Sequence, residues 1–110
     1  MIKLNCHPYN CEMWFTVKIR EFYRKRRALT GRVSEVDVLG MVSCTDNRAR
    51  MVIGVFDNDN SVLVHEISHA AINAFDYMGM DINPHTTEAF AYFIESLHRQ
   101  CTAYMNSQAL

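Results

Sequence analysis

The chain has 110 residues, of which 49% are hydrophobic and 21% are charged, so it contains enough apolar surface for one packed domain over residues 1–110. This composition excludes a disordered tail, and the length excludes a large multi-domain enzyme. Eleven Lys and Arg residues against twelve Asp and Glu residues give a net charge of −1. Bulk charge therefore favours neither nucleic acid nor an anionic membrane as a partner.

The N-terminal segment has no continuous apolar stretch that would suit a secretory signal, and no run of residues is apolar enough to predict a membrane span. The four cysteines, Cys6, Cys11, Cys44 and Cys101, are too scattered to predict a disulfide scaffold. Cys6, His7 and Cys11 lack the further ligands of a zinc knuckle. We therefore expect a cytoplasmic protein with reduced thiols.

The first third of the chain predicts a short strand followed by a helix. Residues 12–18 are rich in aromatic and β-branched types, which favour a strand. From Val17 to Leu29 apolar residues recur at helical spacing among basic ones, and Gly31 suits the end of a helix. The basic run 24–27 is interpreted as a solvated helix face.

Two β-branched runs follow, Val36–Ser43 and Arg50–Phe56, separated by the polar stretch 44–48. This arrangement predicts an antiparallel pair of strands. The capping residues of 57–61 then lead into a helix over 61–78 that ends at Gly79. A last helix is expected to begin at the pair Asn83-Pro84, after a short connection, and to run to about Met105.

The helix over 61–78 contains His65-Glu66-Ile67-Ser68-His69, an H-E-x-x-H sequence. Residues four apart lie on one face of a helix, so both imidazoles can bind one tetrahedral zinc ion. Glu66 can then accept a proton from water as a general base. The motif predicts a zinc-dependent hydrolase.

A catalytic zinc ion needs a third protein ligand. A histidine six residues after the second would indicate a metzincin, but that position is Phe75. Glu88 follows His69 after eighteen intervening residues and lies in the first turns of the last predicted helix. Glu88 is therefore the predicted third ligand, and His85 is an alternative.

This spacing resembles that of the gluzincins, zinc metallopeptidases with two histidines in H-E-x-x-H and a glutamate from the following helix. The segment E-A-F-A-Y-F at 88–93 is similar to the N-E-G-F-A sequence around the glutamate of aminopeptidase-type members, although Thr87 replaces Asn and Ala89 replaces Gly. The G-x-M-E-N sequence of those aminopeptidases is missing, so their recognition of a substrate N-terminus is not implied. The resemblance covers residues 50–95.

The chain also resembles small phage and prophage proteins regarded as metallopeptidases, and minimal gluzincins of similar size. The resemblance implies an α+β, zincin-like domain: a small antiparallel or mixed sheet, a backing helix, an active-site helix and a glutamate helix. It implies that Met51–Phe56 is the edge strand beside a peptide or protein substrate. For a phage-encoded protein it implies the cytoplasm of the host cell.

The same resemblance implies Zn²⁺ held by His65, His69 and Glu88, with Glu66 as the general base in peptide-bond hydrolysis. A donor to the developing oxyanion is also needed, and the candidates are Tyr92, His85 and His98. Residues that could orient the ligands are Asp76, Tyr92 and Glu95, which lie on the same helix faces as the ligands.

A second function class stays open at this point. In it the protein is a non-catalytic phage protein of zincin fold that binds a host factor, and its zinc is structural. The small size of the chain favours this alternative, because it leaves little room for a substrate cleft. The sequence predicts neither the substrate nor the oligomeric state.

Overall fold

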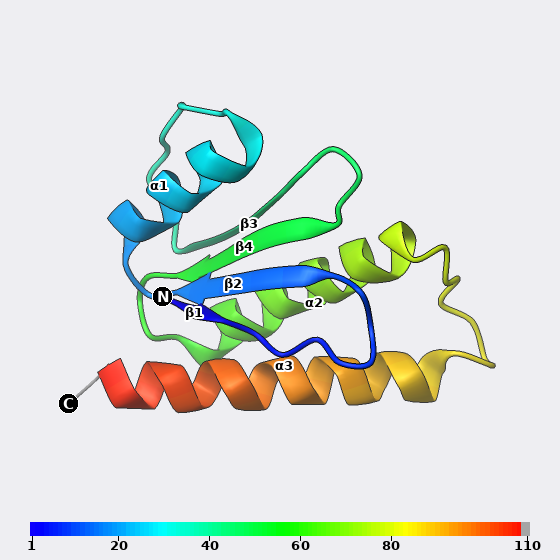
Figure 1. Ribbon diagram of the computed structural model, residues 1–110. Helices are drawn as coiled ribbons and strands as arrows, with labels where there is room; N and C mark the ends of the chain where they lie inside the picture. Colours follow the sequence, from blue (N-terminus) through cyan, green and yellow to red (C-terminus); the bar gives the residue numbers. More distant parts are fainter. Residues whose placement is uncertain (109–110) are drawn as a thin grey trace.

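A four-stranded mixed sheet lies at the centre of the protein, with helices on both of its faces (Figure 1). The computed structural model describes residues 1–108. Its elements in chain order are β1 (Ile2–Lys3), β2 (Glu12–Thr16), α1 (Ile19–Thr30), β3 (Gly40–Cys44), β4 (Arg50–Val55), α2 (Asn60–Tyr77) and α3 (Thr87–Gln108). The expected α+β class is confirmed.

The strand order is β1-β2-β4-β3. β4 pairs in parallel with β2 and antiparallel with β3, so the antiparallel pairing predicted for the two β-branched runs is confirmed. The expectation that Met51–Phe56 forms the edge of the sheet is wrong. Every residue of β4 after Arg50 is buried, because the strand is covered on both faces and paired on both sides. The edge strand next to α2 is β3.

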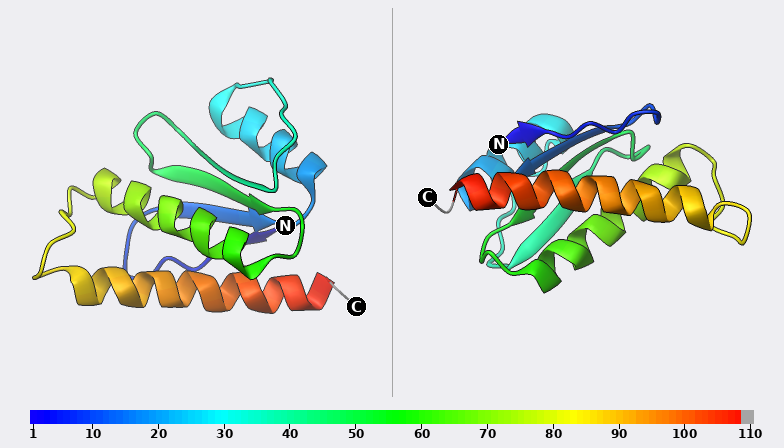
Figure 2. Two further views of the ribbon diagram at one scale, coloured as in Figure 1. Left: turned by 180° about the vertical axis from the view of Figure 1, so that it is seen from behind. Right: turned by 90° about the horizontal axis from the view of Figure 1, so that it is seen from below.

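The two faces of the sheet carry separate cores. Phe22 and Tyr23 of α1 pack with Val52 of β4 on one face. On the other face, α2 and α3 cover β4 and β2 with a larger core (Figure 2). The buried residues of α2 recur at helical spacing: Leu63, Ile67, Ala70, Ala71, Ala74 and Phe75. One face of α2 is therefore used for packing, and the opposite face is free for other roles.

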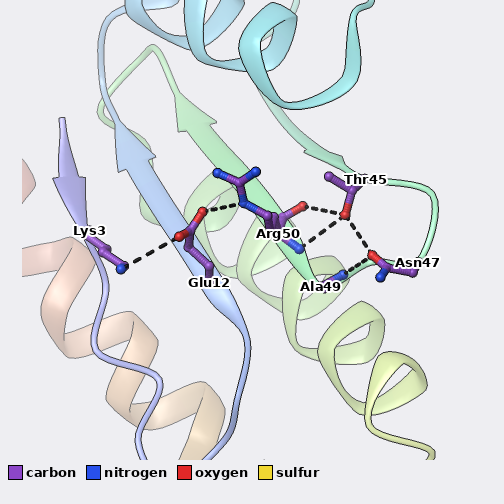
Figure 3. A network of polar contacts seen from close by, with 6 residues as sticks. All are labelled: Lys3, Glu12, Thr45, Asn47, Ala49 and Arg50. Carbon is purple, nitrogen blue, oxygen red and sulfur yellow. Dashed lines mark hydrogen bonds and ion pairs between the residues drawn. The ribbon is translucent and has the colours of Figure 1, made fainter.

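A surface network ties three strands together, as Figure 3 shows. Glu12 of β2 accepts a hydrogen bond from Arg50 Nε of β4 at 2.8 Å and lies 3.7 Å from Lys3 Nζ of β1. At the turn between β3 and β4, Thr45 and Asn47 bind each other and the backbone at the start of β4. These contacts fix the register of the sheet at the end where β2 and β4 begin.

Several predicted boundaries move by a few residues, each for a local reason. α1 begins at Ile19 because the Thr16 hydroxyl accepts a hydrogen bond from Lys18 N and ends the strand there. β3 begins at Gly40 rather than Val36. The backbone of Ser34 and Val36 instead bonds to the side chains of Arg26 and Tyr23 on α1. The interpretation of 24–27 as a solvated helix face is therefore wrong at Arg26, whose side chain is buried against β3.

The predicted end of α1 is confirmed, because Gly31 adopts a left-handed conformation with φ of 75° there. The start of α2 is confirmed too, since the Asp59 side chain caps it by accepting from Ser61 N. The last helix, however, begins at Thr87. The Asn83 side chain accepts from His85 N and closes a separate turn before the helix, so the connection between α2 and α3 is longer than expected.

Within residues 1–108, no helix combines the length and the apolar character that crossing a membrane requires.

Candidate functional site

His65 and His69 lie on the face of α2 that is turned away from the core, and both are exposed. Their Nε2 atoms are 3.2 Å apart, and the rings meet edge to face with centroids 4.7 Å apart. Two nitrogens, each about 2.0–2.1 Å from one tetrahedral zinc ion, lie about 3.3 Å apart. The two side chains therefore converge at a separation that suits two ligands of one ion.

Glu66 follows His65 but points toward the sheet, where it is only 8% exposed. Gly40, the first residue of β3, allows this placement. A Cβ atom at Gly40 would lie 3.0 Å from Glu66 Cγ and 2.7 Å from Val62 Cγ1. A residue with a side chain would therefore push β3 away from α2 at this point.

The carboxylate of Glu66 has no partner of its own. Among residues 1–108, no side chain or backbone group donates a hydrogen bond to it, and it forms no ion pair. Burial raises the pKa of the Glu66 carboxyl, and the nearby imidazoles of His65 and His69 lower it by less. Such a carboxyl titrates closer to neutral pH than an exposed one, which suits a group that accepts and releases protons.

A surface pocket of about 310 Å³ opens at this carboxylate and at one of the histidines. Its lining comes from β3 and the segment before it and from the first turns of α2: Leu39, Gly40, Ser61, Val62, His65 and Glu66. A second hollow, of about 350 Å³, lies near Phe56 and Met105 and contains neither histidine. The site that the motif predicts thus faces a space that water or a small chemical group can enter.

Glu88 lies in the first turn of α3, as expected, and is exposed. The structure does not bring it into a cluster with the two histidines. Within residues 1–108, no three His, Cys, Asp or Glu side chains lie together in an arrangement that could hold a metal ion. His85, the alternative ligand, lies in the turn before α3, where its backbone N–H donates to Asn83.

The remaining candidates lie at some distance from the histidine pair. Asp76 forms an ion pair with Arg48 at 2.7 Å, so its carboxylate is engaged at the β3–β4 turn rather than with a histidine. His98 Nε2 lies 2.8 Å from Asn60 Oδ1 at the start of α2. Tyr92 is 67% exposed and Glu95 is exposed as well, both on α3.

Sequence reasoning found both histidines and the acid but missed Gly40, which brings β3 against Glu66. A signal was present, because a glycine inside a β-branched run often marks a close approach of another chain segment. It also missed that Glu66 is buried, because this depends on which strand lies beside α2. Helical periodicity contains no information on that neighbour.

Comparison of the chain with models of protein families, with curated proteins and with solved structures gave no match in any of the three. What is established is an α+β fold with a small four-stranded mixed sheet and three helices in residues 1–108.

Proposed function

We propose that this protein is a zinc-dependent peptidase of the gluzincin type. The observation that carries the proposal is the pairing of two convergent imidazoles with a buried carboxylate that has no partner and faces a pocket. The Glu66 oxygens are not among the buried side-chain atoms that lack a partner, so they are open to the pocket, where water or a substrate group can contact them.

His65 and His69 would hold zinc through Nε2, as their 3.2 Å separation supports. Glu88 would be the third ligand. The Glu88 carboxylate makes no hydrogen bond or ion pair within residues 1–108. Glu88 lies just after the long connection between α2 and α3. When bound, Zn²⁺ would supply Lewis acidity toward a peptide carbonyl and toward water.

Glu66 is the general base of the proposed reaction. Its carboxylate accepts a proton from the attacking water and later transfers it to the leaving amine. Burial beside Gly40 supports this role in two ways, because it raises the basicity of the carboxylate and fixes its direction. The pocket next to it provides the space for the scissile bond.

β3 supports a peptide as the substrate. It is one of the two edge strands of the sheet, and the residues at its start line the same pocket as His65 and Glu66. An extended peptide can add to a free strand edge through backbone hydrogen bonds. A peptide bound in this way runs past Glu66 with its scissile bond near the histidines.

The test is the zinc content of the purified protein and of its variants, measured by mass spectrometry. We expect one zinc ion per chain in the wild type and loss of zinc in His69→Ala and Glu88→Ala. His98→Ala is the matched control and should retain zinc, because His98 contacts Asn60 instead. Zinc retained in Glu88→Ala but lost in His85→Ala would assign the third ligand to His85.

Absence of zinc in the wild type after reconstitution would contradict the proposal. Stoichiometric zinc without hydrolysis of any peptide in a mixed peptide library would favour the non-catalytic alternative. The proposal and its alternative are therefore separated by activity once zinc binding is established.

A further inference from the structure

Cys6 and Cys11 face each other at the end of the β1–β2 hairpin. The antiparallel register pairs Ile2 with Phe15 and Lys3 with Trp14, and Leu4 N donates to Met13 O at 2.8 Å. Continued toward the turn, the same antiparallel register places Cys6 opposite Cys11. The connecting turn is closed by a hydrogen bond from Tyr9 N to Cys6 O at 2.8 Å.

Both thiols also point to the same face of the hairpin. Side chains alternate along a strand, so Cys6 shares a face with Leu4, and Cys11 shares one with Met13. Leu4, Met13 and Cys6 are buried in the core beneath α2 and α3, and Cys11 packs against that core. Directly opposed side chains on one face have Cβ atoms about 4.5–5.5 Å apart, close to the range of a disulfide.

The two cysteines differ in their access to solvent. Cys11 lines a surface hollow of about 300 Å³, together with Lys3 and Arg50. Cys6 lies behind it and is 5% exposed. An oxidant can therefore reach Cys11 before Cys6.

We propose that Cys6 and Cys11 form a redox modification site, in which a peroxide converts the two thiols into an intramolecular disulfide. The Cys11 thiolate attacks one peroxide oxygen, the O–O bond breaks, and hydroxide leaves and takes up a proton to form water. The Cys6 thiol then attacks the sulfur of the Cys11 sulfenic acid, the S–O bond breaks, and a second water leaves. One peroxide is reduced to two waters as two thiols are oxidised.

The electrostatics of the pair support this order of attack. Contact with Cys6 lowers the pKa of the Cys11 thiol, whereas contact with Cys11 and burial raise the pKa of the Cys6 thiol. Cys101 provides the contrast within the same core, because it is fully buried and burial raises its pKa to about 12. Cys101 is therefore expected to stay reduced.

The disulfide would fix a loop that holds the two helices of the larger core. Tyr9, within this loop, packs edge-on against Phe75 of α2 and Phe93 of α3, with ring centroids 5.7 and 5.0 Å apart. A covalent closure of the loop restricts the unfolded chain, so oxidation should raise the midpoint of thermal unfolding.

The experiment treats the native full-length chain with hydrogen peroxide, alkylates the remaining thiols after denaturation and maps the tryptic peptides. We expect the peptide over residues 4–18, which contains both cysteines, to lose two hydrogen atoms and to resist alkylation until dithiothreitol is added. Cys44 and Cys101 should remain alkylated. Independent alkylation of Cys6 and Cys11, or a link from either one to Cys44 or to a second chain, would overturn the proposal.

Two variants sharpen the result. In Cys6→Ser the oxidised Cys11 has no second thiol, so its sulfenic acid should accumulate and react with dimedone. Cys44→Ser is the matched control and should form the disulfide as the wild type does. If Cys11 gave no dimedone adduct in Cys6→Ser, the assignment of Cys11 as the attacking thiol would be wrong.

Discussion

Two charged side chains are buried on opposite faces of the sheet, and they differ in what surrounds them. Arg26 of α1 and Glu66 of α2 are each 8% exposed. Arg26 donates to Ser34 O at 2.6 Å and to Ser43 Oγ at 3.3 Å. Glu66 has no such partner within residues 1–108 and faces a pocket.

The difference distinguishes a buried charge that holds two elements together from one that is open to a pocket. A buried charge costs several kcal/mol unless it is hydrogen-bonded or paired. The partners of Arg26 belong to the segment before β3 and to β3 itself, so this guanidinium joins α1 to the sheet. Glu66 joins no other element through its carboxylate, which is open to the pocket, and this arrangement suits a group that exchanges protons with water.

The largest effect is expected for Glu66→Gln. Loss of the general base should lower the rate of peptide hydrolysis by about 10²–10⁴-fold, with zinc content unchanged. Because the buried carboxylate carries a desolvation cost, the free energy of unfolding should stay within about 1 kcal/mol of the wild type or rise. Hydrolysis assays and urea unfolding measure the two effects. Glu35→Gln, on exposed surface before β3, is the control, and an equal loss of rate in both variants would contradict the role of Glu66.

Arg26→Leu should show the opposite pattern. Removing the guanidinium leaves Ser34 O and Ser43 Oγ without their donor, so the free energy of unfolding should fall by about 2–3 kcal/mol. Hydrolysis per folded molecule should be retained. Urea unfolding tests this against Arg24→Leu, an exposed position on the same helix where a change of about 0.5 kcal/mol is expected. Equal stability of the two variants would remove the distinction between the two buried charges.

Gly40→Ala should affect both properties. Its new methyl group meets Val62 Cγ1 and Glu66 Cγ, so we expect a loss of about 1–3 kcal/mol in stability and a displaced Glu66 with reduced hydrolysis. Val62→Ala removes the nearest contact, and the double variant should recover part of the stability. A double variant that shows only the sum of the single losses would indicate that the contact with Val62 is not the cause.

The smallest effect concerns Glu12, at the surface network of β1, β2 and β4. The hydrogen bond from Arg50 lowers the pKa of the Glu12 carboxyl in the folded protein. This stabilisation is present above the ordinary pKa of glutamate and is lost as pH falls through the lowered folded pKa. Glu12→Gln should cost about 0.5–1 kcal/mol at neutral pH and nothing at about pH 2. Urea unfolding at both pH values tests this, and a pH-independent difference would assign the effect to packing.

Local patterns in the sequence predicted the helix that contains the two histidines. The helical spacing of His65 and His69, the capping cluster at 57–61 and the stop at Gly79 all depend on neighbours within one or two turns. Each is reproduced in α2, since the helix spans Asn60–Tyr77 and Gly79 adopts a φ of 68°.

What the sequence did not predict depends on distant segments. The parallel pairing of β2 with β4 joins segments far apart in the chain, and it moves β4 from the edge to the interior. β1 has only two residues, too few for any periodicity to show. The late start of α3 follows from side-chain bonds of Asn83 and Thr86, which compete with the helix cap that the same residues suggest.

The proposed function requires a zinc ion at His65 and His69, on the exposed face of α2. This is tested by the zinc-edge X-ray absorption spectrum of the zinc-loaded wild-type protein. We expect a shell of two imidazole nitrogens with oxygen ligands and no sulfur. A spectrum with sulfur ligands would assign the metal to Cys6 and Cys11 instead, and it would contradict the proposed site at His65 and His69.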